Sequence, residues 1–340
     1  MKKITRTLLF ILIVCAVFSV SALAFDDMPN DWSTKALESA VENGLLTGDG
    51  NYLKPKDSLT RAQMAAVMTR AFGASAEKDL SEFVDIPENA WYREAMAKAY
   101  CMNIFRGDGA GHMNPENPVT REEAFTVLAR ALCLDENSSA DALSIFSDAD
   151  NVSDWAKGTL ASMVKNSYVK GSDGKLNPRN HITRAEFAQL MYNIVSLYVD
   201  DESDVEKIAG AQGNVIIRKN VGKLENLSLE NDLIIADGVE GTLELANVNV
   251  GSRIVVRSNV KIIYSGKTPL IISDVDGVSL TLEKGAEVET LSLPENSVIT
   301  DNTREETKPT TPSTPSVPSK PDTGDGEEKE DEEDIWTDFH

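Results

Sequence analysis

The chain has 340 residues, and its 55 acidic residues outnumber its 33 Lys and Arg residues, which gives a formal net charge of −22. A strongly acidic chain argues against binding to nucleic acid or to anionic lipid. The length predicts about two globular domains. The chain has three cysteines and three histidines, and they lack the spacing of a zinc site.

The first 24 residues have the features of a secretory signal peptide. Positively charged residues precede an apolar run over residues 8–20, and Ala22-Leu23-Ala24 follows as an A-x-A cleavage site. The apolar run is short for a membrane span. We therefore expect an exported protein whose mature chain begins near Phe25 and has no membrane-spanning segment.

A four-residue block, Thr-Arg-x-Glu/Gln, occurs three times and contains Arg61, Arg121 and Arg184. Its arginines are 60 and 63 residues apart, and a period of this size indicates a repeated structural unit. Three further features recur upstream of each block. They are the tryptophans Trp32, Trp91 and Trp155, the glycines Gly48, Gly107 and Gly171, and a Phe with a nearby aspartate, namely Asp26, Asp85 and Asp148.

Each block is predicted to begin a helix. A Thr followed three residues later by Glu or Gln is a capping box, and apolar residues at helical spacing come next. Helices are also expected upstream, over residues 91–100 and 155–164. Asp-Gly pairs lie between the two helices of each unit and indicate turns. Each unit is therefore predicted to contain a helix, a loop and a second helix.

The arginine of each block occupies the first helical position, where the helix dipole is unfavourable to a cation. Free backbone N–H groups, the dipole and the guanidinium would together form a site for a carboxylate or a phosphate. A salt bridge to a nearby acidic residue is the structural alternative. The recurrence of the arginine at all three helix starts favours a ligand.

With these motifs the chain resembles proteins that carry three S-layer homology (SLH) repeats. The hallmark of that family is a Phe-x-Asp opening, a Trp, a Gly-Ile/Leu-x-x-Gly segment and an Ile-Thr-Arg-Ala-Glu block. Residues 182–186 match the last block in full, Leu59–Gln63 differs by one polar residue, and Glu122 replaces the alanine in the second block. The resemblance covers residues 25–198. We assign the repeats to residues 25–80, 81–140 and 141–200, after a signal peptide over 1–24.

The resemblance implies an all-α bundle with pseudo-threefold symmetry, in which grooves between the lobes bind secondary cell-wall polysaccharide, often with a pyruvate ketal. The three arginines would contact the anionic sugar. The tryptophans would line the grooves or pack beneath them, and the aspartates would bind sugar hydroxyls or order a loop. The glycines would let the backbone approach the ligand, with a helix C-cap as the alternative. Repeat 3 is expected to be the most typical site and repeat 2 the least, because Glu122 could compete for the Arg121 guanidinium.

Residues 208–302 have a different pattern, with short β-rich runs separated by Gly, Asn and Asp. Apolar triplets recur at positions 233, 254 and 270, and rungs of this length are typical of a short parallel β-helix or solenoid. A small β-sandwich is the alternative. The segment contains no histidine, nucleophile motif or phosphate-binding glycine loop. We therefore predict no catalytic residue, metal or cofactor.

Residues 303–340 form a Pro/Thr-rich linker and an acidic tail, whose composition predicts disorder. Cys101 and Cys133 could form a disulfide outside the cell. Both fall on apolar helix faces, which favours buried free thiols instead.

The sequence thus predicts a multidomain protein, secreted to the bacterial cell surface or S-layer, in which an all-α module precedes an all-β domain. We expect non-covalent binding to a secondary cell-wall polymer, either free or linked to peptidoglycan. A wall-anchored enzyme that degrades polysaccharide with its β-domain is the alternative.

Overall fold

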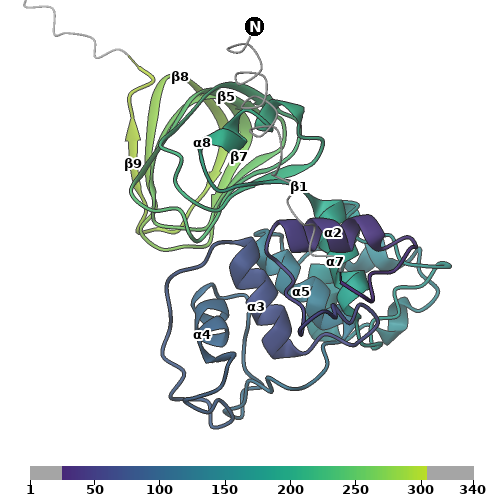
Figure 1. Cartoon of the computed structure of the whole chain (residues 1–340). Coiled ribbons are helices and arrows are strands. Elements are labelled where there is room, and N and C mark those ends of the chain that lie inside the picture. The colour runs from purple at the N-terminus through teal and green to yellow at the C-terminus, as the bar shows by residue number, and fades with distance from the viewer. Residues whose placement is uncertain (1–24, 305–340) are drawn as a thin grey trace, which may run out of the picture. The chain divides into compact units, whose positions relative to one another are not determined.

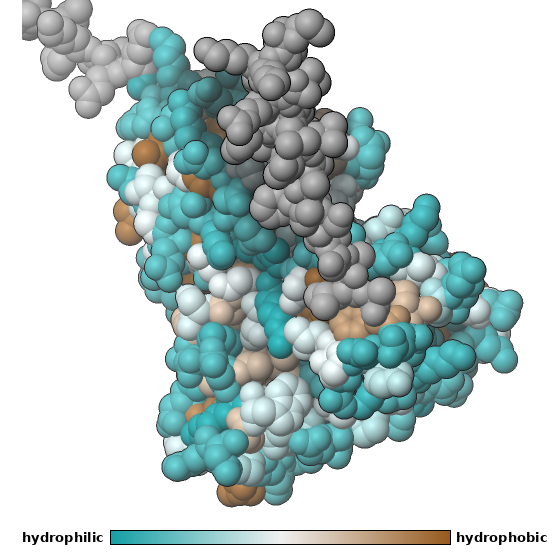
Figure 2. All heavy atoms as spheres, viewed as in Figure 1, coloured by the Kyte–Doolittle hydropathy of each residue, from teal (hydrophilic) through white to brown (hydrophobic). Residues whose placement is uncertain are grey.

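The computed structural model describes residues 25–304 (Figure 1). The predicted signal peptide over 1–24 and the linker and tail over 305–340 lie outside the described residues. No helix between residues 25 and 304 is long and apolar enough to cross a membrane. On the face drawn in Figure 2, hydrophilic residues predominate and the hydrophobic ones are scattered, as is usual for a protein surface.

The helical part contains two α-helices in each predicted repeat. They are α2 (Thr34–Glu42) and α3 (Arg61–Ala71), then α4 (Arg93–Cys101) and α5 (Arg121–Ala131), then α6 (Lys157–Lys165) and α7 (Arg184–Ile194). The third repeat adds the short 3₁₀ turns η1 (Ala140–Leu143), η2 (Ala149–Asn151) and η3 (Asp154–Ala156). The predicted order of helix, loop and helix is therefore present in all three units.

The capping boxes begin α3, α5 and α7 as the sequence predicts. In each helix the hydroxyl of the N-cap threonine accepts a hydrogen bond from the backbone N–H of the N3 residue. The N3 side chain in turn accepts one from the backbone N–H of the threonine. These reciprocal bonds fix the residue at which each helix starts. The first helical residue is then the arginine of the repeated block in all three cases.

Backbone hydrogen bonds close a cycle through the three repeats. The N–H of Leu59 donates to the carbonyl of Ile182 at 2.9 Å, that of Ile182 to Val119 at 2.9 Å, and that of Val119 to Leu59 at 2.8 Å. All three side chains are buried. Each of these residues directly precedes a capping threonine, so the cycle brings the starts of α3, α5 and α7 together.

The β-domain is a solenoid in which all the strand pairs are parallel, so the sandwich alternative is wrong. Its rungs stack with apolar residues in register, as in the column of Leu224, Leu245, Tyr264 and Leu282. Its strands are β1 (Val195–Val199), β2 (Asn214–Ile217), β3 (Lys223–Leu229), β4 (Leu233–Ile235), β5 (Thr242–Val250), β6 (Arg253–Val256), β7 (Lys261–Ser273), β8 (Ser279–Ser292) and β9 (Val298–Asp301).

The first strand of the solenoid follows α7 without a linker. β1 pairs with β2 and begins at Val195, within the stretch that the sequence assigns to the third repeat. The acidic segment that follows β1 contains two short helical turns, α8 (Glu202–Val205) and η4 (Ile208–Gly210). The β-domain therefore starts before the expected boundary at residue 208, and the acidic segment lies inside it.

Strands β2, β4 and β6 are buried on both faces. Their flanking residues belong to the solenoid core, whereas the middle residues Ile216, Ile234 and Val255 belong to the same core cluster as the helices. Strands that are covered on both faces have continuous apolar runs rather than alternating ones. This explains the apolar triplets, and it shows that the solenoid packs directly on the helical repeats.

Three solenoid arginines extend this contact by binding helix ends. Arg218 donates to the carbonyl of Asn43 at 2.9 Å, Arg253 to that of Cys133 at 3.2 Å, and Arg257 to that of Met102 at 2.8 Å. The acceptors lie at the ends of α2, α5 and α4, where unpaired carbonyls and the helix dipole favour a cation. Each arginine is also ion-paired with a solenoid aspartate, namely Asp200, Asp232 or Asp237.

Candidate functional site

The three arginines of the repeated block each reach into a loop of another repeat. Their Nε–H groups donate to backbone carbonyls, from Arg61 to Met113 at 2.8 Å, from Arg121 to Leu176 at 2.9 Å, and from Arg184 to Leu53 at 2.8 Å. The bonds run in one direction, from repeat 1 to 2, from 2 to 3, and from 3 to 1. Every arginine therefore lies between two repeats.

Aspartates hold the loops that receive these arginines. Both carboxylate oxygens of Asp85 accept backbone N–H groups, from Met113 at 2.9 Å and Asn114 at 2.7 Å. Asp148 does the same with Leu176 and Asn177. Because these carboxylates are occupied by the backbone, they order the loop whose carbonyl contacts the arginine.

In repeat 1 this role belongs to Asp27 and not to the neighbouring Asp26, which was predicted from the sequence. The carboxylate of Asp27 accepts from the N–H groups of Leu53 and Lys54, each at 2.7 Å. Asp26 is exposed, and its backbone N–H donates to the carbonyl of Asn51. The Phe-x-Asp spacing of the other two repeats is thus kept by Phe25 and Asp27.

The glycines make room for the phenylalanine of their own repeat. A Cβ added to Gly48 would lie 2.1 Å from the ring of Phe25, and the matching distances are 2.5 Å for Gly107 and 2.6 Å for Gly171. The alternative of a helix C-cap is wrong, because the preceding helices end earlier, at left-handed residues. Those residues are Gly44, Asn103 and Ser167.

The backbone N–H groups at the helix starts are not free, which corrects one part of the sequence-based argument. The N–H of Arg61 donates to the carbonyl of Asn117 at 3.0 Å, and the next N–H, of Ala62, donates to Pro115 at 2.8 Å. The other two helices repeat both bonds. Carbonyls of a neighbouring repeat thus occupy these donors, and the guanidinium group remains as the candidate for binding an anion.

The tryptophans lie at the surface instead of packing in the core. Trp32, Trp91 and Trp155 are 62%, 65% and 55% exposed. Trp32 lines a hollow of about 690 Å³ together with Arg121, and Trp155 lines one of about 510 Å³ together with Arg61. The hollows are open grooves, and each draws its arginine, its glycine-bearing loop and its tryptophan from three different repeats.

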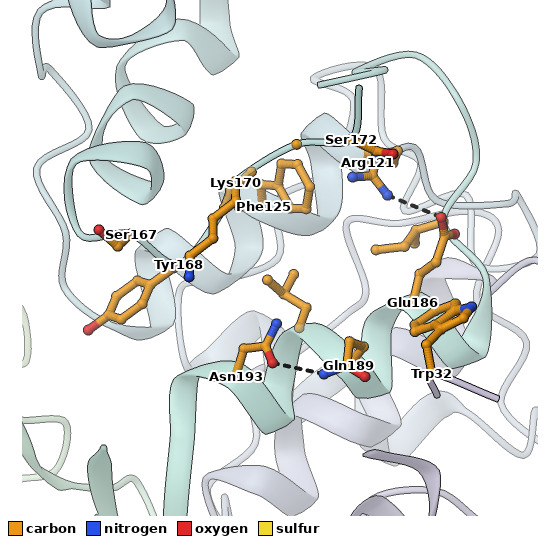
Figure 3. A pocket seen from close by; sticks show the side chains of 14 residues that line it. Trp32, Arg121, Phe125, Ser167, Tyr168, Lys170, Ser172, Glu186, Gln189 and Asn193 are labelled. Carbon is orange, nitrogen blue, oxygen red and sulfur yellow. Dashed lines mark hydrogen bonds and ion pairs between the residues drawn. The ribbon is translucent and has the colours of Figure 1, made fainter. Parts of the chain in front are cut away.

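We call these surfaces the Arg121 groove and the Arg61 groove, after their arginines. Figure 3 shows the Arg121 groove, with Arg121 facing Glu186, Trp32 beside Glu186, and Tyr168 and Lys170 on the loop across from α7. Trp91 and Arg70 line a third hollow of about 400 Å³, together with Glu94 and Lys98. Arg184 does not line this hollow, but Arg184 and Arg70 both donate to carbonyls of the 45–53 segment.

Two of the arginines form ion pairs with N3 glutamates of the capping boxes. Arg61 lies 3.3 Å from Glu123, and Arg121 lies 3.3 Å from Glu186. These pairs are not predicted by the capping-box pattern, in which the N3 residues serve only as helix caps. The signal was present in the repeated block, but the pairing joins different repeats and depends on their arrangement.

Glu122 does not compete for the Arg121 guanidinium, although its position in the sequence allowed for this. It is buried, and its carboxylate accepts hydrogen bonds from the backbone N–H and the hydroxyl of Ser153 at 3.0 and 2.7 Å. Arg179 lies 3.5 Å from the same carboxylate. The proposed competition for the Arg121 guanidinium is therefore absent, and Glu186 is its partner instead.

The electrostatic setting of the three arginines favours an anion. Burial lowers the pKa of Arg61, Arg121 and Arg184, and nearby carboxylates offset only part of this decrease. An arginine remains charged at any physiological pH. The Arg61 and Arg121 grooves thus each hold a partly desolvated positive charge and an exposed aromatic ring.

The fold and the grooves define a class of protein, a module of three helical repeats followed by a β-solenoid. The family model described as "S-layer homology domain" matches residues 24–65, 82–125 and 145–188. The chain therefore carries three SLH domains, as the repeated motifs predicted.

Several known proteins are similar to this chain. The Surface-layer 125 kDa protein of Lysinibacillus sphaericus is 32% identical over 229 residues, which cover 66% of this chain and 19% of that protein. Exoglucanase XynX of Acetivibrio thermocellus is 29% identical, over 51% of this chain and 16% of its own. Amylopullulanase of Thermoanaerobacterium thermosulfurigenes is 30% identical, over 50% and 9%. The chain thus spans less than a fifth of the length of each of these relatives.

Proposed function

We propose that this protein is secreted to the bacterial cell surface and that its three SLH domains anchor it non-covalently to the cell wall. One observation carries the proposal. The Arg61 and Arg121 grooves each combine an arginine, a glycine-bearing loop and an exposed tryptophan from three different repeats. The similarity to a surface-layer protein supports the same role.

We infer that the repeats form a helical bundle with pseudo-threefold symmetry. The cycle of hydrogen bonds through Leu59, Val119 and Ile182 supports this arrangement, as do the arginine contacts that run from each repeat to the next. A symmetric bundle would present three related grooves. Weak binding in several grooves would then add up through effective concentration.

The ligand that fits these grooves is an anionic wall polysaccharide. An exposed indole offers an apolar face to a sugar ring, and a guanidinium binds a carboxylate such as that of a pyruvate ketal. A secondary cell-wall polymer with such ketals would engage both groups at once. We propose this polymer as the partner of the three grooves, whether or not it is linked to peptidoglycan.

The β-solenoid has a structural role in this proposal and no catalytic one. Among residues 25–304, no group of three His, Cys, Asp or Glu side chains is arranged to hold a metal ion. An enzyme with its activity in the β-domain is the competing hypothesis, and the similarity to an exoglucanase and an amylopullulanase keeps it open to test. A reducing-sugar assay on the mature protein with wall polysaccharide should show no product above background.

Variants of the arginines test the anchoring role. In a pull-down with purified cell-wall sacculi, Arg184→Ala should weaken binding more than Arg121→Ala, because Glu186 neutralises Arg121 whereas Arg184 has no ion pair among residues 25–304. Exposed Lys267→Ala on the solenoid serves as the control. Unchanged binding by both arginine variants would contradict the proposal.

A further inference from the structure

A further cavity, of about 350 Å³, lies where turns of the solenoid meet the end of α4. Its solenoid wall comes from three successive turns, at Asp237 after β4, at residues 257–259 after β6, and at residues 274–276 after β7. Strands β4, β6 and β7 pair in register just before these turns. The three turns therefore stack at one corner of the solenoid and contribute to one cavity.

The opposite wall comes from the helical repeats. Cys101, Met102 and Asn103 line it at the end of α4, and Ala74 and Ala76 line it after α3. A helix C-terminus carries a partial negative charge. This wall therefore adds to the negative potential of the cavity.

The cavity carries more negative than positive charge. Three carboxylates line it, those of Asp237, Asp274 and Asp276, whereas Arg257 is the one cation among its described lining residues. Arg257 is fully buried and already paired, with Asp237 at 3.0 Å and with Asp274 at 3.3 Å. Three carboxylates against one guanidinium leave an excess of two negative charges. A cleft with this balance attracts a cation.

The ionisable groups around the cavity reflect this excess. Burial raises the pKa of Asp237, Arg257 offsets part of the rise, and Asp274 adds to it. Burial and then Asp237 raise the pKa of the Cys101 thiol, against a smaller effect of Lys78. The ammonium group of Lys78 lies 4.3 Å from the centre of the Tyr100 ring, and Lys78 does not line the cavity. It therefore leaves the excess charge inside uncompensated.

Several polar side chains of the cavity have unused hydrogen-bonding capacity. Ser258 is only 7% exposed, yet its hydroxyl has no hydrogen-bond partner among residues 25–304. A buried hydroxyl without a partner is costly and indicates a missing group. Asn103, Asn259 and Asp276 are exposed, and their side chains make no hydrogen bond within the same residues. Asp274 accepts hydrogen bonds only through Oδ1.

These features fit an organic cation better than a metal ion. No three His, Cys, Asp or Glu side chains in the described part of the chain are arranged to hold a metal. The volume falls within the range of about 300–1,000 Å³ that is usual for small-molecule sites. Amide and hydroxyl side chains both donate and accept hydrogen bonds, so they match the hydroxyl groups of a ligand. The ligand should thus combine an ammonium group with several hydroxyls.

We propose that this cavity binds an amino sugar with a free ammonium group. Asp274 and Asp276 hold the ammonium group, and Asn103, Asn259 and Ser258 bind the sugar hydroxyls. The inference goes beyond the proposed anchoring, because none of the arginines of the repeated block lines this cavity and the ligand has the opposite charge.

Two glycosides that differ in charge test the proposal. Methyl glucosaminide carries an ammonium group, whereas methyl N-acetylglucosaminide is neutral, and each is titrated calorimetrically into the mature protein. We expect one site for methyl glucosaminide. The neutral glycoside should bind about tenfold more weakly, because it cannot form a charge-assisted hydrogen bond to the carboxylates.

A single charge variant assigns the binding to the cavity. Asp276→Asn changes an exposed side chain that has no hydrogen-bond partner among residues 25–304, so the fold should be kept. It should weaken the binding of methyl glucosaminide about tenfold and leave that of the neutral glycoside unchanged. Glu295→Gln removes the same charge from an exposed solenoid residue outside the cavity and should bind as the wild type does.

Different results would overturn different parts of the inference. Equal affinity for the two glycosides would show that the cavity does not select an ammonium group. Unchanged binding of methyl glucosaminide by Asp276→Asn would place its site elsewhere. N-acetyl-lysine methylamide is a third probe, with an ammonium group but no sugar, and equally tight binding of it would refute the assignment to an amino sugar. Failure of all three probes to bind would refute the site itself.

Discussion

At the scale of single residues, three aspartates order the loops that receive the arginines. Asp27, Asp85 and Asp148 each hold two successive backbone N–H groups, and the carbonyl of the first residue of each pair receives an arginine from another repeat. The second residue of each pair has a left-handed conformation, with φ between 51° and 56°. A left-handed backbone conformation is unfavourable for residues other than glycine. The hydrogen bonds to the carboxylate therefore help to stabilise this tight loop.

Comparison of two adjacent aspartates tests this role. Asp27→Ala leaves two backbone N–H groups without their acceptor, and we expect a loss of about 1–3 kcal/mol in the free energy of unfolding. Asp26→Ala removes an exposed side chain and should change it by less than about 0.5 kcal/mol. Thermal or urea unfolding of the two variants gives the comparison. Equal losses would show that the loop does not depend on Asp27.

The same carboxylate should make the fold sensitive to acid. Burial raises the pKa of Asp27, but the hydrogen bonds from Leu53 and Lys54 outweigh it, so the pKa lies below its usual value. A carboxyl whose pKa is lowered by folding stabilises the protein above its unfolded pKa and loses that effect as the pH falls towards its folded pKa. Between pH 5 and pH 3 (about the range of unperturbed carboxyl groups), wild type should therefore lose more stability than Asp27→Asn in urea unfolding. Parallel curves would contradict this.

The two cysteines should differ in reactivity. Both are free thiols, with Cys101 exposed and Cys133 buried, so the expectation of buried free thiols holds for Cys133 alone. Burial raises the pKa of the Cys133 thiol to about 11, and the thiolate is the reactive form. A maleimide should modify one thiol in the native mature protein at pH 7.5 and two after denaturation. Fast native modification of Cys133, mapped by mass spectrometry, would contradict the structure.

At the scale of elements, the sequence predicted the local structure better than the contacts between elements. The capping boxes predicted the first residues of α3, α5 and α7, because these signals depend only on residues close in the chain. The parallel rungs of the solenoid were also predictable from their spacing. The ion pairs of Arg61 and Arg121 join residues about sixty positions apart, and only the arrangement of the repeats brings them together.

The contact between the solenoid and the helices was missed, although the sequence contained a sign of it. Strands that face solvent on one side alternate, whereas the triplets of β2, β4 and β6 are apolar throughout. Such runs indicate a strand covered on both faces. What covers the second face cannot be read from the strand itself, and here it is the ends of the repeat helices.

Arg257 is the most buried polar group between the solenoid and the repeat helices, and its substitution tests this contact. Its side chain is fully buried, paired with Asp237, and bonded to the carbonyls of Met102 and Arg130. Arg257→Met leaves a buried carboxylate and two carbonyls unpaired and should cost about 3–5 kcal/mol. Lys267→Met, which breaks the exposed pair with Glu287, should cost less than about 1 kcal/mol. Similar losses in chemical unfolding would show that the contact does not form.

At the scale of the whole molecule, the repeats and the solenoid share one core. The helical cluster includes Ile216, Ile234 and Val255 of the solenoid, and α7 continues directly into β1. The solenoid is thus joined to the repeats by packed apolar residues as well as by the chain itself, with no linker between α7 and β1.

A truncated protein tests this shared core. A fragment of residues 25–194 exposes the apolar residues that β2, β4 and β6 cover and leaves helix-end carbonyls without their arginines. It should unfold at a lower temperature than the 25–304 fragment, and the longer fragment should show a single transition. Independent domains would be indicated by two separate transitions of the 25–304 fragment in calorimetry, one of them at the unfolding temperature of the 25–194 fragment.

The central claim is that the three SLH domains anchor the protein by recognising acidic groups on the wall polymer. The most direct measurement is co-sedimentation of the mature protein with purified sacculi, before and after mild acid treatment that removes pyruvate ketals. We predict that the protein sediments with untreated sacculi and stays in solution with treated ones. Equal sedimentation with both would contradict the claim, because the arginines would then have no ketal carboxylate to recognise.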